Sequence, residues 1–147
     1  MIMKPEAKVI RPGVGLAGVI LNGDKILMGL RKGSHGSGAW APPGGHLEMF
    51  EDFDYSLMRE IDEETGLVGK SLKLLDYNPC VVTNDFFEED NKHYVTLFFK
   101  LQYLSGMPKV REPDKCEEWR WCYWDDLPSP LFKSIENLKE MDYNPFR

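Results

Sequence analysis

The sequence predicts an α+β fold, in the form of an α/β/α sandwich, within one domain that spans residues 1–147. Three observations support this interpretation. The chain has 147 residues, a length that fits one ordinary domain. Hydrophobic residues make up 42% and charged residues 29%, a composition that allows a buried core and is not typical of a disordered chain. Strand-like segments alternate with two helix-like segments, and no repeat or linker divides them.

The N-terminal part is expected to form a β-hairpin followed by a long loop. The segment 14–21 is rich in aliphatic residues and predicts a buried strand, and 26–30 predicts the return strand. Asn22, Gly23 and Asp24 separate the two. An Asn-Gly pair between apolar runs indicates a type I′ turn, because both central residues of that turn need a positive φ. The segment 31–45 is rich in Gly, Ser and Pro and predicts a loop.

The remaining segments predict two helices and several strands. Residues 52–65 are the clearest helix candidate, and Gly66 stands where helices commonly end in the left-handed conformation. A second helix is expected over 131–141, after the breakers Pro128 and Pro130. Aromatic and β-branched residues predict strands at 81–82, 94–101 and 119–124.

The charge balance excludes one class of partner. Lysine and arginine number 18 against 24 aspartate and glutamate residues, which gives a net charge of -6 and a pI near 5.1. This balance argues against a module that holds nucleic acid by neutralising many phosphates, so no stable nucleic-acid partner is expected. An acidic protein that acts on phosphates would have to bring in its positive charge as metal ions.

The cysteines and the apolar segments indicate a reduced, soluble, cytoplasmic protein. Cys80, Cys116 and Cys122 form no CxxC pair, and none of the three histidines lies near a cysteine at ligand spacing. A structural zinc site is therefore not expected. The segment 1–6 lacks the apolar core of a signal peptide. The longest strongly apolar stretch, 14–21, is too short to cross a bilayer, so no membrane partner is expected.

Three glutamates of the first predicted helix are the strongest candidates for a functional site. Glu60, Glu63 and Glu64 lie three and four residues apart, so they share one face and border the apolar stripe that should pack inward. A solvated acidic face is the ordinary alternative. Partial burial would cost several kcal/mol for each ionised carboxylate unless a cation compensates, which favours a metal site. Clustered carboxylate oxygens suit Mg²⁺ or Mn²⁺ better than zinc.

The residues before this helix are compatible with phosphate chemistry. Gly44 and Gly45 would let backbone atoms approach a ligand where a side chain would block them. Glu51, Asp52 and Asp54 lie at the helix start, where negative charge complements the helix dipole. Each feature has an ordinary alternative: a Gly-Gly pair is usually a turn, and an acidic first turn is commonly a helix cap.

Together these residues resemble the Nudix box, Gx5Ex7REUxEExGU. Gly45 is followed after five residues by Glu51, and after seven more by the sequence REIDEETGL of residues 59–67, which matches every specified position. Similarity beyond the box points to the small MutT-like nucleotide-sanitising subgroup of Nudix hydrolases. The resemblance implies an α/β/α sandwich around a mixed sheet, with the box as a loop–helix–loop. It also implies hydrolysis of nucleoside triphosphates to the monophosphate and pyrophosphate.

The resemblance also implies roles for individual residues. Glu60, Glu63 and Glu64 would bind Mg²⁺, with Mn²⁺ as a substitute, and a carbonyl of Gly44 or Gly45 would add a ligand. Arg59 would hold Glu60 and Glu51 in place by charge-assisted hydrogen bonds. Glu112 resembles a further metal-binding or base carboxylate, and a solvated loop charge is the alternative. The subgroup often forms homodimers.

The substrate is less closely defined by the sequence. Candidate walls for a nucleobase are Trp40, Leu16, Leu131 and Phe132, because they flank loops expected near the box. His46 and His93 are candidates for contacting a base or a phosphate, and a structural role is the ordinary alternative for a lone histidine. Nucleoside triphosphates, oxidised ones included, are the first expectation. Dinucleotides, nucleotide sugars and isoprenoid diphosphates remain alternatives, because the box recognises the diphosphate and its metals. A Nudix-fold sensor without catalysis, or a purely structural acidic helix, would be a different class of protein.

One departure from the subgroup concerns the loop before the helix. The position before Glu51 usually holds glycine, but this chain has Phe50. Glycine often marks a φ that other residues resist, so a bulky side chain here could alter the loop. The change removes no expected metal ligand.

Overall fold

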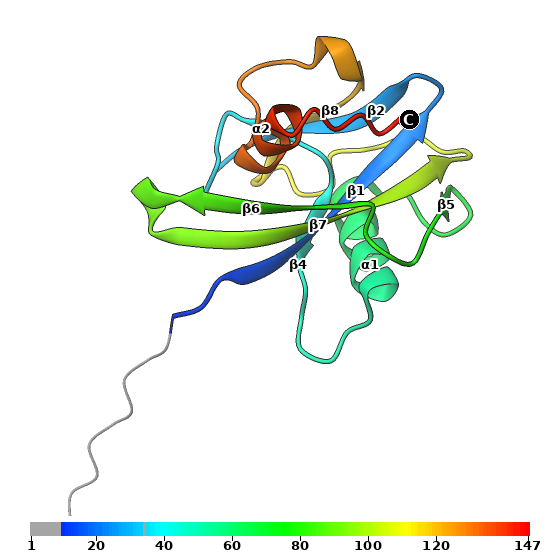
Figure 1. Ribbon diagram of the computed structural model, residues 1–147. Helices are drawn as coiled ribbons and strands as arrows, with labels where there is room; N and C mark the ends of the chain where they lie inside the picture. The colour runs from blue at the N-terminus through cyan, green and yellow to red at the C-terminus, as the bar shows by residue number, and fades with distance from the viewer. Residues whose placement is uncertain (1–9, 34) are drawn as a thin grey trace, which may run out of the picture.

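The computed structural model describes residues 10–33 and 35–147, which form one mixed sheet between two helices (Figure 1). The elements, in chain order, are β1 (Gly13–Asn22), β2 (Lys25–Arg31), β3 (Trp40–Ala41), β4 (Gly44–His46), α1 (Phe53–Thr65), β5 (Leu72–Leu74), β6 (Val81–Phe87), the 3₁₀ turn η1 (Glu88–Asp90), β7 (Lys92–Tyr103), β8 (Cys116–Tyr123), η2 (Trp124–Asp126) and α2 (Lys133–Glu140). The expected α+β class with a mixed sheet is confirmed.

The sheet is organised around the long strands β1 and β7, which run parallel from Gly13↔Tyr94 to Leu21↔Gln102. The other pairings are antiparallel. Strand β7 pairs with β5 and β6, and β2 pairs with β3 and β8. Strand β1 meets β2 near their hairpin and β4 at Gly15–Ala17, so β1 and β2 diverge away from the turn.

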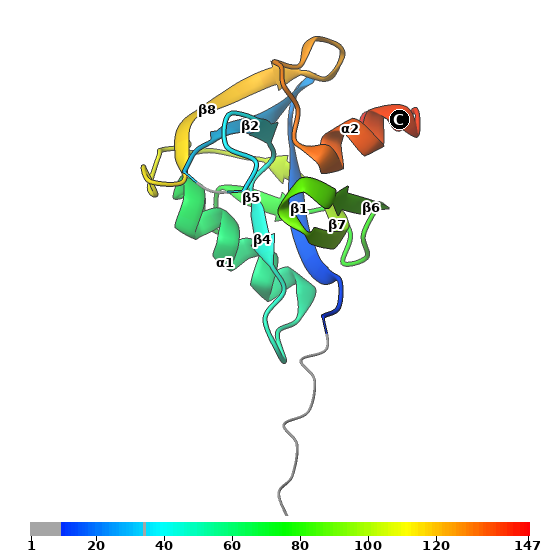
Figure 2. The same cartoon turned by 90° about the vertical axis from the view of Figure 1, so that its left-hand side faces the viewer.

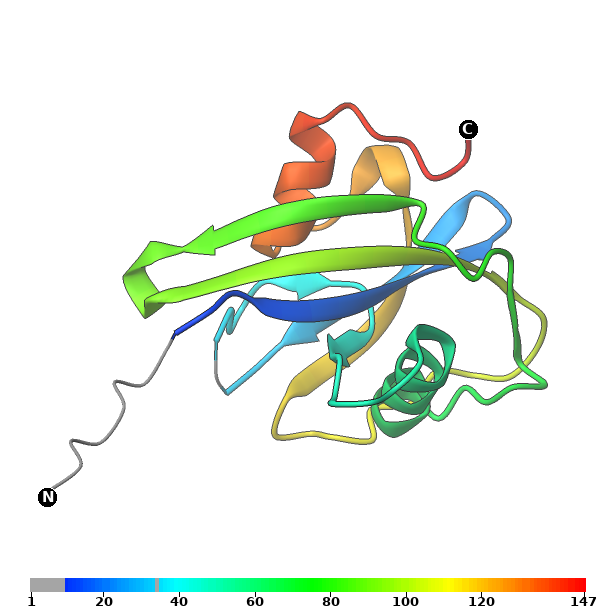
Figure 3. The ribbon, with the colours of Figure 1, turned by 60° about the horizontal axis from the view of Figure 1, so that its bottom comes forward.

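The two helices cover opposite faces of the sheet, as Figures 2 and 3 show. Side chains alternate along each strand, so neighbouring residues enter different apolar layers. On β1, Ala17 and Val19 belong to the layer beneath α2, which contains Ile135. Leu16 and Ile20 belong to the layer beneath α1, which contains Ile61. The structure therefore has the three-layer arrangement that the alternation of strands and helices predicts.

The predicted elements are present with longer bounds for most strands, and the loop prediction for 31–45 needs correction. Within that segment, β3 pairs with β2 and β4 pairs with β1. Two- and three-residue strands carry too short a pattern to be distinguished in a Gly- and Pro-rich sequence. The short strand β5 was likewise not predicted.

The first hairpin turn also differs from its prediction. The register pairs Asn22 with Lys25, so Gly23 and Asp24 are the two turn residues. Of these, Gly23 has a positive φ of 62°, whereas Asp24 does not have a positive φ. Glycine at the first central position fits a type II′ turn, and the expected type I′ turn is not formed.

Neither helix in the described ranges is both long and apolar enough to span a bilayer.

Candidate active site

Helix α1 packs one face on the sheet and leaves a carboxylate edge beside it. Leu57 and Ile61 are fully buried, and Gly18 of β1 provides the space for Ile61, because a Cβ there would lie 2.9 Å from Ile61 Cδ1. The Glu60 side chain is 16% exposed and that of Glu63 is 50% exposed. The carboxylates therefore range from largely buried to half-exposed, at the border of the packed face.

Arg59 connects three carboxylates around the start of the helix. Its Nε and Nη2 donate to the two oxygens of Glu51 at 3.1 and 2.9 Å. Its Nη1 donates to Glu60 Oε1 at 3.1 Å and to Glu63 Oε1 at 3.3 Å. The hydrogen bonds from Arg59 lower the pKa of Glu51. The guanidinium group thus fixes Glu51 bidentately and turns Glu60 and Glu63 toward the same side.

Glu64 is the most strongly perturbed carboxyl group of the site. Its Oε2 accepts a hydrogen bond from the backbone N–H of Gly44 at 3.1 Å. Burial, together with the charges of Glu60 and Glu112, raises the pKa of Glu64 to about 8 against the opposing effect of the Gly44 hydrogen bond. Burial also raises the pKa of Glu60, against the opposing charge of Arg59. Carboxylates held together in this way favour a bound cation.

The two glycines before the helix allow strand β4 to lie close to its neighbours. A Cβ on Gly44 would lie 2.0 Å from the carbonyl oxygen of Leu16. A Cβ on Gly45 would lie 2.2 Å from the carboxyl carbon of Glu60. The Gly-Gly pair is thus required because a side chain at either position would displace β1 or the Glu60 carboxylate.

The carboxylate edge of α1 forms one wall of a cavity of about 550 Å³. Gly15 and Leu16 of β1 and Gly29 and Arg31 of β2 also line the cavity. It therefore lies where these two strands diverge, and the volume is sufficient for a small-molecule ligand.

Another part of the cavity lining is aromatic and comprises His35, Phe87, Tyr94 and Phe132, here called the aromatic end. The ring centroids of His35 and Phe87 are 4.1 Å apart, and those of Phe87 and Phe132 are 5.2 Å apart. These rings come from the β2–β3 loop, β6, β7 and the residue before α2. Aromatic walls with a few polar groups are typical of sites that bind planar rings.

Arg31 lies at the aromatic end, with its guanidinium carbon 4.4 Å from the centre of the Phe132 ring. Its Nε and Nη2 donate to the carbonyl oxygen of His35 at 3.1 and 2.8 Å. Burial lowers the pKa of Arg31, and the charge of Glu64 opposes that shift. Across the described ranges, no carboxylate oxygen lies within 4.0 Å of this guanidinium group. It is therefore available to an anionic ligand.

Comparison with known proteins extends the similarity from the box to most of the chain. A family model described as the NUDIX domain matches residues 10–141 of the chain. The chain belongs to the Nudix family. The resemblance that the box residues carry is thereby confirmed, and the chain is a Nudix pyrophosphohydrolase that acts on diphosphate bonds.

Relatives of this Nudix hydrolase act on different diphosphates. The ADP-ribose pyrophosphatase of Methanocaldococcus jannaschii is 29% identical over 138 residues, which cover 94% of this chain and 78% of that protein. The 8-oxo-dGTP diphosphatase of Buchnera aphidicola subsp. Schizaphis graminum is 31% identical, covering 84% and 91%. A MutT NUDIX hydrolase structure from Burkholderia pseudomallei has a TM-score of 0.75 and 31% identity, covering 86% and 95%.

The structure brings most of the predicted Nudix site residues to one cavity. Its lining includes Gly44, Gly45, Arg59, Glu60, Glu63, Glu64 and Glu112, together with His46 and Phe132. Glu51 lies outside the lining, bound to Arg59. Trp40 and Leu131 also lie outside it. Trp40 is 5% exposed within the α2-side core and bridges to Leu131. The structure does not support these two as pocket walls, because the α2-side apolar layer contains Trp40 and packs against Leu131.

The predicted metal ligands are near one another, but their side chains do not converge on a common point. Over the ranges 10–33 and 35–147, no three acidic, His or Cys side chains converge as a group that could hold a metal ion. The hydrogen bonds explain this arrangement: Glu60 and Glu63 turn to Arg59, and Glu64 turns to Gly44.

The cavity lining also contains residues that were not predicted as site residues, among them Arg31, His35, Asp85, Phe87 and Tyr94. The sequence carried one usable signal for two of them. Thr83, Asp85 and Phe87 alternate along β6, so they share a face of a strand of which only 81–82 was predicted. A charged residue on the buried face of a strand indicates a functional role or a role in connecting elements by hydrogen bonds. Arg31 and Tyr94 show no local pattern, because their roles depend on distant neighbours.

Proposed function

We propose that this Nudix hydrolase cleaves a nucleoside triphosphate, oxidised or unmodified, to the nucleoside monophosphate and pyrophosphate, with Mg²⁺ as cofactor and Mn²⁺ as a substitute. One observation carries the proposal: carboxylates of α1 and several aromatic rings line the same cavity. A nucleotide combines a charged polyphosphate with a planar base and so matches both groups of residues. The 8-oxo-dGTP diphosphatase relative supports the same substrate class.

The residues present fit a hard divalent cation. Glu60, Glu63 and Glu64 would hold it, with a carbonyl group of Gly44 or Gly45 as a further ligand. All of these donors are oxygen atoms, which Mg²⁺ and Mn²⁺ prefer. The raised pKa values of Glu60 and Glu64 show that burial and neighbouring charges penalise their ionised forms. A bound Mg²⁺ would neutralise phosphate oxygens and lower the pKa of water.

The protein's own groups would orient the substrate and the attacking water. Arg59 holds Glu51, Glu60 and Glu63 by hydrogen bonds and positions the carboxylate wall. Arg31 offers a buried positive charge to the phosphate chain. Glu112 is close enough to raise the pKa of both Glu60 and Glu64. We assign it the role of a further metal-binding carboxylate or of the base that accepts a proton from water.

A second candidate substrate is a nucleotide sugar of the ADP-ribose type. The Methanocaldococcus jannaschii relative, an ADP-ribose pyrophosphatase, favours it, and the same cavity would place its diphosphate against the carboxylate wall. A panel of nucleoside triphosphates, dinucleotides, nucleotide sugars and isoprenoid diphosphates, ranked by kcat/KM with Mg²⁺, separates these candidates. The proposal requires a nucleoside triphosphate to rank first.

The metal-binding assignment is tested by Glu63→Gln and Glu64→Gln. Each change removes a ligand charge at nearly constant volume, so we expect Mg²⁺-dependent pyrophosphate release to fall by about 100-fold or more. The matched control is Glu136→Gln, an exposed glutamate of α2, which should leave the rate unchanged. Unaltered turnover in both site variants would refute the assignment.

A further inference from the structure

A buried carboxylate, Asp85, lines the aromatic end of the cavity without an assigned role. Asp85 is 1% exposed. Its Oδ2 accepts hydrogen bonds from the hydroxyls of Thr96 at 2.6 Å and Thr83 at 3.2 Å, and its Oδ1 accepts one from Asn137 Nδ2 at 2.8 Å. A carboxylate has about four lone-pair sites. Three neutral donors therefore leave Oδ1 with room to accept one more hydrogen bond.

A second acceptor at this end is the ring of His35, whose side chain is 10% exposed. His35 Nδ1 lies 2.8 Å from Asp90 Oδ2. Because a carboxylate can only accept, Nδ1 carries the proton, and Nε2 is an acceptor whenever the ring is in its neutral form. This Nε2 is buried, and it has no hydrogen-bond partner in the part of the chain that the structure describes. A buried acceptor without a donor is costly unless a ligand supplies one.

Both acceptors are neighbours of the Phe87 ring. Asp85 and Phe87 are two residues apart on β6, so their side chains share a face of the strand. The ring of His35 packs against Phe87 with its centroid 4.1 Å away. Asp85, His35 and Phe87 all line the cavity. The aromatic end thus combines ring surfaces with hydrogen-bond acceptors, a combination that suits a planar group with N–H donors.

We propose that Asp85 and His35 are binding residues that select a nucleobase with an exocyclic amino group, such as cytosine, adenine or guanine, over one with a carbonyl at that position. This inference rests on the proposed function and names the part of the substrate that reaches the aromatic end. Cytosine N4, adenine N6 and guanine N2 are amino donors, whereas thymine and uracil present a carbonyl oxygen at O4. A carbonyl facing these acceptors would leave them unpaired and repel them.

The test compares substrates that differ in one amino group. CTP and UTP, ATP and ITP, and GTP and xanthosine triphosphate are assayed as pairs by kcat/KM with Mg²⁺. Methyl triphosphate, which has phosphates but no base, reports on the phosphate chemistry alone. We expect the amino-bearing member to be preferred about tenfold or more in at least one pair. This factor corresponds to the contribution of one hydrogen bond to a charged group.

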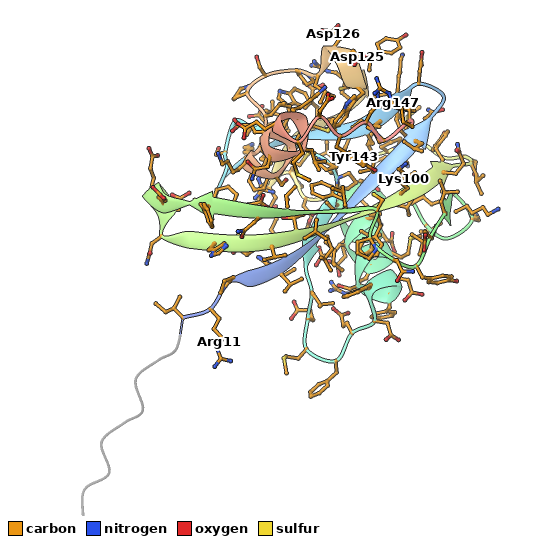
Figure 4. All side chains as sticks on the ribbon, in the orientation of Figure 1. Arg11, Lys100, Asp125, Asp126, Tyr143 and Arg147 are labelled. Atoms are coloured by element: carbon orange, nitrogen blue, oxygen red, sulfur yellow. The ribbon has the colours of Figure 1, made fainter. Side chains whose placement is uncertain are left out.

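Two variants remove the acceptors one at a time. In Asp85→Asn, the amide oxygen still accepts from Thr96 and Thr83, and Asn137 can rotate its amide to preserve the remaining bond. His35→Phe retains an aromatic ring in the β2–β3 loop, outside the helices and strands, so it provides a second variant where the substitution of Asp85 lowers stability. Each should abolish or reverse the amino preference and change kcat/KM for methyl triphosphate less than twofold. The matched control is Asp126→Asn, in η2 on the far side of the molecule from α1 (Figure 4).

The outcomes separate the two proposals. If no nucleotide and no methyl triphosphate is hydrolysed by the wild type, the proposed function itself is wrong. If nucleotides are hydrolysed but no pair shows a preference, or both variants keep it, the inference about Asp85 and His35 is overturned. If a variant slows all substrates equally, methyl triphosphate included, its residue acts only in holding the structure, and the inference is overturned for that residue.

Discussion

At the scale of single residues, Phe50 stands out in the loop before α1. Its φ is 64° and its side chain is fully exposed. A bulky residue in the left-handed region is strained by roughly 1 kcal/mol or more. The glycine usual at this position of the subgroup therefore reflects a backbone requirement, and this chain meets the same requirement with an unfavourable residue.

Replacing Phe50 by glycine should stabilise the protein. The side chain loses no packing, while the strain is relieved, so we expect Phe50→Gly to raise the free energy of unfolding by up to about 1 kcal/mol, reduced by the greater entropy of glycine in the unfolded chain. Asn91→Gly is the control, because Asn91 has φ 51° and asparagine tolerates this region better. Urea unfolding measures both, and a loss of stability in Phe50→Gly would contradict the strain argument.

The Glu64 carboxyl group makes stability depend on pH in the metal-free protein. Its pKa is raised to about 8 by burial, above its ordinary value of 4.5. The folded state therefore binds this proton more tightly than the unfolded state. The resulting stability is fully present below pH 4.5 and is lost as the pH rises toward and through 8.

Glu64→Gln should remove that pH dependence. In EDTA, the variant should gain stability relative to the wild type between pH 5 and 8.5, by about 2 kcal/mol or several degrees in Tm. Adding Mg²⁺ should reverse part of the difference, since the wild-type carboxylate would then have a cation. Thermal unfolding at both pH values checks this. A constant difference between the two proteins would show that Glu64 does not titrate in this range.

At the scale of elements, helix α1 depends on how it ends. Gly66 has φ 77° and its N–H donates to the carbonyl of Asp62. The 107–111 segment covers this end: Lys109 N–H donates to Thr65 O, and Arg111 contacts Asp62. The N–H of the left-handed residue satisfies a terminal carbonyl, and the left-handed conformation ends the helix.

Gly66→Ala should destabilise the protein by about 1 kcal/mol, because alanine resists the left-handed conformation and its Cβ would lie 3.2 Å from Arg111 Cδ. Gly69→Ala is the matched control, since a Cβ there would have no atom within 4 Å and its φ is not in that region. Chemical denaturation should show a change below about 0.5 kcal/mol for the control. Equal effects in both would contradict the role of the left-handed cap.

At the scale of the whole molecule, two apolar layers perform different tasks. Ile61 of α1 and Ile135 of α2 are fully buried, each in the apolar layer between its helix and the sheet. Removing one methylene group from either costs about 0.5–1.5 kcal/mol. The layer under α1 also sets the position of the carboxylate wall.

Ile61→Val and Ile135→Val should therefore destabilise the protein similarly and differ in activity. We expect Ile61→Val to lower kcat several-fold, because a small shift of α1 moves Glu60 and Glu64 together. Ile135→Val should leave kcat within about twofold. Unfolding curves and Mg²⁺-dependent turnover measure the two quantities. Equal losses of kcat would show that the layers are not functionally distinct.

The sequence alone was sufficient for α1 and its carboxylates. Helical periodicity places Glu60, Glu63 and Glu64 on one edge, and the fixed spacing from Gly45 and Glu51 defines the family. These features are local, because they depend on residues three to fourteen positions apart and on the regular geometry of one helix. The hydrogen bonds of Arg59 to Glu51 and Glu60, expected from the resemblance, are present for the same reason.

Only the tertiary structure decided which residues share the cavity. Arg31 and His35, Asp85, and Phe132 come from three separate segments, and their proximity follows from the pairing of β1 with β7 and the docking of α2. The sequence was compatible with Trp40 in the pocket or in the core, and the structure places it in the apolar layer on the α2 side. Such contacts depend on sheet register and on the packing of the layers. Both are set by residues throughout the chain, so they leave no local pattern around any one residue.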